Sequence, residues 1–267
     1  MAWHHAVIAG VLGWRSEDDV KAAISTEIDS GIGQASALRL AREGFRILGL
    51  SASAPAVARF TALMPDACAL CLDLTSVDAP SKSIAAAMDA FGRLDAIVNI
   101  AVASGGDDLL GTTDRDLDDL IAQLVRAPFR MVREALPVLQ SGSAIVNVIS
   151  PLAVVGGADH GASGIMHAAL VGLTTHLAVQ YGPRGIRSNA VAVMAEDASE
   201  RHSADAVLLA AMTPATRLGN AGDAANAIAY LASSRAGFIN GQVLTVDGGW
   251  SGTRRIVKPG GGYASYV

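Results

Sequence analysis

The chain has 267 residues, a formal charge of −5, and 51% hydrophobic residues against 17% charged ones. That length suits one α/β domain or two small ones, and the hydrophobicity excludes an intrinsically disordered chain. The mild acidity, without a basic cluster, argues against a nucleic-acid-binding surface. The apolar residues 6–14 are too few to span a bilayer and follow no Lys or Arg. They predict neither a membrane anchor nor a signal peptide, so we expect a cytoplasmic protein.

Short β-type runs alternate with longer helical patterns along the chain. The β-type runs cover residues 5–9, 46–50, 67–72, 96–99, 144–149, 187–193 and 242–246. Helical patterns include residues 35–43, 83–91, 114–139, 164–181 and 221–231. Strands that alternate with helices require right-handed crossovers, so the pattern predicts a parallel α/β sheet of seven strands with helices on both faces.

One segment interrupts this alternation after the first β-type run. Residues 16–19, Ser-Glu-Asp-Asp, are a favourable helix start, because the acidic side chains lie against the positive end of the helix dipole. Val20, Ile24 and Ile28 then recur at a spacing of four, which is one face of a helix. We therefore expect residues 11–29 to form a helical insertion.

The two cysteines, Cys68 and Cys71, have the spacing of a redox or metal-binding pair. They lie in a β-type run, however, where residues three apart point to opposite faces. The sequence therefore predicts two unpaired thiols in the core, and no metal site.

Four further segments are together typical of one enzyme family. They cover residues 30–44, 92–99, 177–189 and 241–250, with the sequences SGIGQASALRLAREG, GRLDAIVN, LAVQYGPRGIRSN and GQVLTVDGGW. On these residues the chain resembles the short-chain dehydrogenase/reductases over nearly its whole length. The resemblance implies a Rossmann-type doubly wound sheet in a single domain of residues 1–253, a nicotinamide cofactor, and assembly into dimers or tetramers. Residues 254–267 are Gly-rich without periodicity and are interpreted as a tail.

The family's phosphate loop is altered in this chain. In the family, a glycine-rich turn after the first strand places helix N–H groups against the cofactor pyrophosphate. Gly31 and Gly33 stand where the last two glycines belong. The first glycine is either Gly10, with the insertion interrupting the loop, or is replaced by Glu27, with residues 21–26 as the first strand. The phosphate site is lost under either alternative, because the insertion would block it sterically or because carboxylates would stand against the phosphate. We favour the inserted helix, which would cover the vacated cleft, and interpret both glycines as helix–sheet packing positions.

The rest of the implied cofactor site is also altered. After the second strand, where the family has an acid or a basic residue for the ribose end, this chain has Ser51 followed by an alanine. The two turns that shape the nicotinamide pocket are replaced at residues 99–102 and 193–194. We therefore expect no cofactor, and interpret a set of residues as remnants of the site: Gly10, Gly31, Gly33, Ser51, Asp73 at the adenine end, and Asn99.

The family's catalytic group is Asn, Ser, Tyr and Lys, with the Lys one helical turn after the Tyr. Residues 168–174 align so that Ser163 stands at the Tyr position and His167 at the Lys position. Ser150 then matches the family serine, and Leu124 stands at the Asn position. A serine hydroxyl cannot replace a phenol as acid/base, and a histidine is not reliably charged at neutral pH. The sequence thus predicts loss of the family's redox chemistry.

The segments that pair subunits in the family remain, namely the two long helices and the closing strand. We expect a catalytically inactive subunit in a hetero-oligomer with an active NAD(P)-dependent dehydrogenase. The family offers a precedent in the CoA-ester dehydrogenase of anaerobic benzylsuccinate breakdown, so a CoA ester or hydroxyacyl substrate is the expectation for the complex. An inactive homo-oligomer is a weaker variant.

The alternative is a non-redox enzyme in the former cofactor cleft. Ser150, Asp159, His160, Ser163 and His167 lie close in sequence, and a Ser-His-Asp grouping performs acyl transfer. The chain lacks a Gly-x-Ser-x-Gly nucleophile elbow at these positions, since a proline follows the first serine. A metal site on the same histidines lacks a third ligand at a suitable spacing.

Overall fold

The computed structural model describes residues 20–101, 109–156, 161–194, 204–252, 255–257 and 263–265. Its centre is a seven-stranded parallel sheet in the order β3-β2-β1-β4-β5-β6-β7. The strands are β1 (Ala22–Ser25), β2 (Arg46–Ser51), β3 (Cys68–Cys71), β4 (Ala96–Ile100), β5 (Ala144–Ile149), β6 (Arg187–Val193) and β7 (Val243–Val246). The predicted fold class is confirmed. The strand order reverses between β1 and β4, where ligands bind in sheets of this type.

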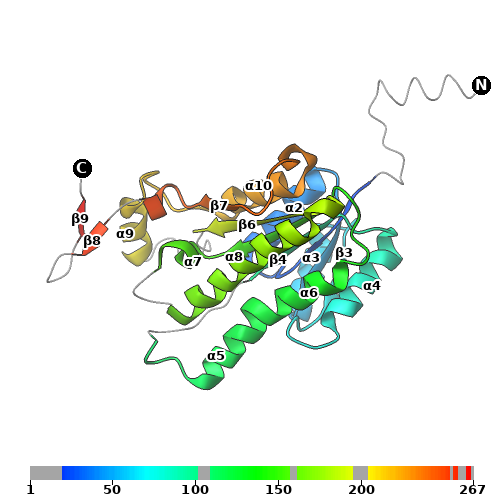
Figure 1. Cartoon of the computed structure of the whole chain (residues 1–267), viewed down its shortest axis with the longest axis horizontal. Coiled ribbons are helices and arrows are strands. Elements are labelled where there is room, and N and C mark those ends of the chain that lie inside the picture. Colours follow the sequence, from blue (N-terminus) through cyan, green and yellow to red (C-terminus); the bar gives the residue numbers. More distant parts are fainter. Residues whose placement is uncertain are drawn as a thin grey trace, which may run out of the picture.

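Helices cover both faces of the sheet (Figure 1). They are α2 (Gly31–Arg42), α3 (Ala54–Leu63), α4 (Ala79–Phe91), α5 (Asp114–Leu120), the π-helical segment η2 (Ile121–Arg126), α6 (Ala127–Ala135), α7 (Leu152–Val155), α8 (Gly161–Tyr181), η3 (Gly182–Arg184), α9 (Ala204–Met212), α10 (Ala221–Ala232), and the short turns η4 (Ser234–Ala236) and η5 (Trp250–Gly252). One face carries α2 and α10, which contact each other, and the other carries α4, α6 and α8.

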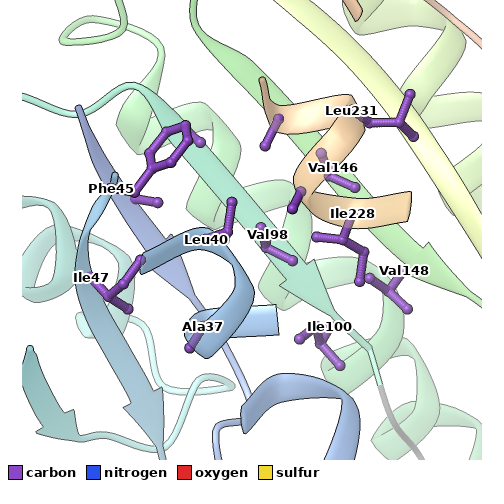
Figure 2. Packing of buried hydrophobic residues seen from close by; sticks show 14 of the residues in the cluster. Ala37, Leu40, Phe45, Ile47, Val98, Ile100, Val146, Val148, Ile228 and Leu231 are labelled. Atoms are coloured by element: carbon purple, nitrogen blue, oxygen red, sulfur yellow. The ribbon is translucent and has the colours of Figure 1, made fainter. Parts of the chain in front are cut away.

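The core lies between these layers. Figure 2 shows one cluster, in which Val98 and Val146 of the central strands pack against Leu40 of α2 and Ile228 of α10. Strands β1, β4, β5 and β6 are buried along their whole length, which explains why most of their residues are apolar. Burying one such Leu, Ile or Val side chain stabilises the fold by roughly 1.5–3 kcal/mol before entropy costs.

The apolar helix α8 belongs to this core. The segment Gly161–Arg184 is long and apolar enough to cross a membrane by length and composition alone. In the structure α8 packs along β6, and its buried side contacts the sheet. Its hydrophobicity is therefore explained by the core of an α/β domain.

The first strand differs from the prediction. The first strand of the sheet is β1, Ala22–Ser25, which pairs with β2 and β4. The predicted helical insertion is therefore wrong for residues 20–29, while residues 5–9 and 11–19 lie outside the described part of the chain. Ile24 lies in β1 and Ile28 in the loop that follows it, and both side chains are buried. Their spacing of four therefore reflects two separate buried positions and not one face of a helix. Burial between two neighbouring strands overrides the weak β-propensity of this alanine-rich run.

One smaller expectation also fails. Cys68 and Cys71 are free but exposed, because β3 is an edge strand and not a central one, so the prediction of core thiols is wrong. Within residues 254–267, β8 (Arg255–Val257) pairs antiparallel with β9 (Tyr263–Ser265). The Gly-rich tail thus contains a two-stranded sheet separate from the central one.

Candidate functional site

The loop between β1 and α2, residues 26–30, is short and contains no insertion. Its last residue, Ser30, caps α2: the hydroxyl accepts from the N–H of Gly33 at 3.0 Å and donates to the carbonyl of Glu27 at 2.8 Å. A Cβ on Gly33 would lie 1.9 Å from that same carbonyl oxygen, so only glycine fits there. Gly33 therefore packs closely against the loop. Of the two alternatives for the first glycine position, Glu27 follows β1, and the favoured insertion after Gly10, which itself lies outside the described residues, is wrong.

Glu27 is the unusual residue of this loop. Its φ of 51° lies in the left-handed region, where glycine is favoured and a glutamate is strained. Its side chain lines a cavity at the carboxyl ends of the strands. Burial, and then repulsion from Asp29 and Asp73, raise the pKa of Glu27 to about 7. The carboxyl is therefore partly protonated at neutral pH.

The structure brings Asp73 and Asn99 to the same cavity, which has a volume of about 340 Å³. Asp73 accepts from the N–H and the hydroxyl of Thr75 at 2.9 and 2.7 Å. Ser51 is fully buried at the end of β2 and accepts from the N–H of Ser53 at 3.0 Å, so its hydroxyl serves the backbone. Ser51 is not among the residues that line the cavity.

A buried chain of amides continues from Asn99 into the fold. Asn99 Nδ2 donates to Asn147 Oδ1 at 2.9 Å, Asn147 Nδ2 donates to the hydroxyl of Thr174 at 2.9 Å, and that hydroxyl donates to the carbonyl of Leu170 at 2.7 Å. These bonds join β4, β5 and α8. Sequence analysis did not select Asn147, although an asparagine within an otherwise apolar strand is a detectable signal for such a buried bond.

The two residues that the sequence analysis assigned to the family's Tyr and Lys positions lie on α8. Ser163 and His167 are one turn apart, and both are buried. Burial lowers the pKa of His167 to about 4, and its Nδ1 has no hydrogen-bond partner. The imidazole is therefore neutral at pH 7 and does not carry the charge that a lysine would.

Ser150 lies where β5 ends, and its hydroxyl accepts from the N–H of Leu152 at 3.2 Å. In the part of the chain that the structure describes, no hydrogen bond joins Ser150 to His167. Asp159 and His160 lie outside the described residues. A Ser-His-Asp grouping is therefore not assembled by the residues that the structure places.

Leu124 is fully buried in η2 and packs with Leu120 and with Ala162 of α8. The π-helical segment was not predicted, but Pro128 explains it: a proline has no N–H to donate to the carbonyl four residues before it, here that of Leu124. The N–H of Ala127 bonds instead to the carbonyl of Ala122. Four cavity-lining residues that sequence reasoning missed, Gln123, Ala127, Pro128 and Met131, come from η2 and α6.

Comparison with known proteins gives extensive matches. The family model described as enoyl-(acyl carrier protein) reductase matches residues 27–251. The chain is 31% identical over 240 residues to 2-dehydro-3-deoxy-D-gluconate 5-dehydrogenase of Escherichia coli, covering 86% of this chain and 95% of the relative. It is 30% identical over 239 residues to a 3-oxoacyl-(acyl-carrier-protein) reductase of Staphylococcus aureus, covering 86% and 97% of the two chains.

Solved structures agree with these matches. A double mutant of a Serratia marcescens short-chain dehydrogenase/reductase superposes with a TM-score of 0.82 at 29% identity, over 86% of this chain and 98% of the other. A Burkholderia cenocepacia short chain dehydrogenase, solved in complex with NADP, gives 0.79 at 31% identity, over 87% and 98%. The sheet order, the capped helix after β1 and these matches lead to one conclusion: the chain belongs to the short-chain dehydrogenase/reductase family of oxidoreductases.

Proposed function

We propose that this chain is a non-catalytic member of its family, which works as a subunit beside an active NAD(P)-dependent dehydrogenase. The observation that carries the proposal is the burial of Ser163 and His167 on one face of α8. The sequence pattern assigns these two residues to the positions of the family's Tyr and Lys. Hydride transfer in the family needs a phenol as acid/base beside a cation. A serine and a neutral imidazole supply neither.

The loop after β1 supports the loss of cofactor binding. The N–H groups of Gly31 and Ile32 begin α2 and would suit an anion. The Glu27 side chain lines the adjoining cavity, however, with Asp73 beside it and Asp29 close enough to affect its pKa. Carboxylates repel a pyrophosphate, so the residues present do not fit a dinucleotide.

Exposed apolar side chains support the role of a subunit. Leu117 of α5, Phe129 of α6, and Ile165 and Val179 of α8 are 37–74% exposed, on helices that belong to one contiguous layer. Phe238 is also fully exposed, in the turn that precedes the edge strand β7. Exposed apolar groups of this kind mark association surfaces. The same proposal includes a cytoplasmic location and a CoA ester or hydroxyacyl substrate for the complex.

The competing proposal, a hydrolase built on Ser150 and His167, is less well supported. An acid/base histidine in such a triad needs a carboxylate at Nδ1, which holds the tautomer and raises the basicity of the ring. Nδ1 of His167 has no partner, and burial lowers the pKa of the ring to about 4.

The test is co-expression with a dehydrogenase encoded by a neighbouring gene that retains the family's Tyr and Lys. We expect a mixed oligomer in which cofactor, counted by absorbance per mole of chain, is carried by the partner alone. The chain by itself should show no calorimetric heat of binding with NAD(H) or NADP(H).

A double variant tests the acid/base positions separately. Ser163→Tyr/His167→Lys should give no NAD(P)-dependent turnover, because Glu27 remains in the loop after β1. Adding Glu27→Gly to this double variant tests the contribution of the loop. Micromolar cofactor binding by the natural chain, or turnover by the double variant, would contradict the proposal. A chain that remains monomeric with every candidate partner would contradict its heteromeric part.

A further inference from the structure

The cavity that Glu27 lines is a candidate binding site in this chain, independent of any partner subunit. Its volume of about 340 Å³ lies near the lower end of the range for small-molecule sites, about 300–1,000 Å³. Its described lining includes both polar and apolar side chains. The polar ones include Glu27, Asp73 and Asn99, and the apolar ones include Leu74, Pro128 and Met131.

The polar wall offers hydrogen-bond acceptors that the described residues do not use. The Glu27 carboxyl accepts no hydrogen bond from any of them. The carboxylate of Asp73 accepts hydrogen bonds from the described residues only through Oδ1, from the N–H and the hydroxyl of Thr75. Asn99, 2% exposed, donates through Nδ2 to Asn147, but its Oδ1 receives no donor within the described chain. Three acceptor groups from β1, β3 and β4 thus border one cavity.

The described part of this wall carries no positive charge, since none of its lining residues is a Lys or an Arg. Arg130 of α6 reaches the same edge of the sheet, but its Nη1 donates to the carbonyl of Thr75 at 3.5 Å and not to a carboxylate. A carboxylate in a partly desolvated cavity is costly unless a proton or a cation neutralises it. Burial, Asp29 and Asp73 together raise the pKa of Glu27, as expected for a carboxyl among other negative charges.

We propose that this cavity binds a small organic cation, an amine or amidine joined to a compact apolar body. The N–H groups of the cation donate to Glu27 and Asp73, and Asn99 Oδ1 is a third acceptor. The apolar body packs against the apolar lining residues Leu74, Pro128 and Met131. This selectivity for positive charge is the reverse of what a dinucleotide needs, and it holds whether or not the chain pairs with a dehydrogenase.

Three ligands of one shape test the charge selectivity. Benzamidine, benzamide and benzoate share a ring and differ in charge, and each is titrated calorimetrically into the full chain at pH 8. We expect benzamidine to bind at least tenfold more tightly than benzamide, and benzoate to give no saturable binding. Phenethylamine extends the test to a flexible amine. If neither cation binds saturably, or benzoate binds as tightly as benzamidine, the proposal is wrong.

Variants and pH identify the carboxyl that binds the cation. Glu27→Gln should weaken benzamidine binding at least tenfold at pH 8 and leave benzamide binding unchanged. Asp73→Asn is the second variant, and Glu134→Gln, exposed on α6 and outside the cavity wall, is the control. Each variant is first checked for folding by circular dichroism.

The sign of the pH effect follows from the carboxyl. The groups that raise its pKa are Asp29 from its own loop and Asp73 after β3. With a pKa of about 7, the ionised fraction of Glu27 rises from about one tenth at pH 6 to about nine tenths at pH 8. Benzamidine affinity should therefore rise about tenfold over that range in the natural chain and stay flat in Glu27→Gln. A pH-independent affinity in the natural chain would overturn the assignment. Displacement of benzamidine by NAD(H) would contradict the proposed loss of cofactor binding and leave the cation site standing.

Discussion

Glu27 allows a direct test of the electrostatics of the β1–α2 loop through stability. The folded state holds its pKa at about 7, against an ordinary value of 4.5. Because the folded pKa is raised, the folded chain keeps a proton that the unfolded chain releases. The free energy of unfolding therefore falls as pH rises from about 4.5 to about 7, and this contribution is constant above that window.

The magnitude follows from the two pKa values. One pKa unit corresponds to about 1.36 kcal/mol, so integration between pH 5 and pH 8 gives a loss of about 2.5 kcal/mol. Glu27→Gln cannot ionise and should not show this loss. The variant should gain about 2.5 kcal/mol on the natural chain between these pH values, or roughly 5–10 °C in Tm for a chain of this size.

The assay is urea unfolding followed by circular dichroism, at pH 5 and pH 8, for the natural chain and Glu27→Gln. Glu134→Gln, on the exposed side of α6, is the matched control and should follow the natural chain. The result that refutes the reasoning is a Glu27→Gln variant whose difference from the natural chain is the same at both pH values. That result would mean that water or a cation already compensates the carboxylate.

Three further predictions concern stability and assembly. In the folded state the pKa of His167 is lowered from 6.5 to about 4, so the free energy of unfolding should fall as pH falls through that window, by about 3 kcal/mol at most. His167→Gln should lose less stability over the same range, which urea midpoints at pH 7 and pH 4.5 measure. Gly33→Ala should lower the free energy of unfolding by at least about 3 kcal/mol in thermal or urea unfolding, because its Cβ would lie 1.9 Å from the Glu27 carbonyl oxygen. The control Gly172→Ala on α8, where a Cβ meets nothing within 4 Å, should be neutral or stabilising, and equal effects of the two variants would contradict the close approach at Gly33. Deleting residues 254–267 should weaken assembly with the partner or change the partner's KM while the chain stays folded, as measured by light scattering and kinetics; no change in either would remove this role for the tail.

The sequence alone determined most of the sheet. The runs at β5 and β6 have the predicted bounds, because each is a short run rich in β-branched apolar residues between turn residues. The long helical pattern at residues 114–139 was also detected, but it is three successive segments in the structure: α5, η2 and α6. The break depends on Pro128 together with packing against α8, and periodicity does not record it.

The first strand shows what the sequence alone could not decide. Residues 22–25 are poor β-formers, and the spacing of Val20, Ile24 and Ile28 is equally compatible with a helix. Only the neighbouring strands β2 and β4, distant in sequence, make this run a strand by burying it from both sides.

The candidate site divides in the same way. Residue types at aligned positions were enough to select Asp73, Asn99, Ser163 and His167. The sequence left open whether Glu27 or Gly10 followed the first strand, and tertiary structure decided for Glu27. It also decided the charge states, because the neutral imidazole of His167 and the raised pKa of Glu27 both result from burial. Burial depends on which elements pack together, and no local pattern contains that information.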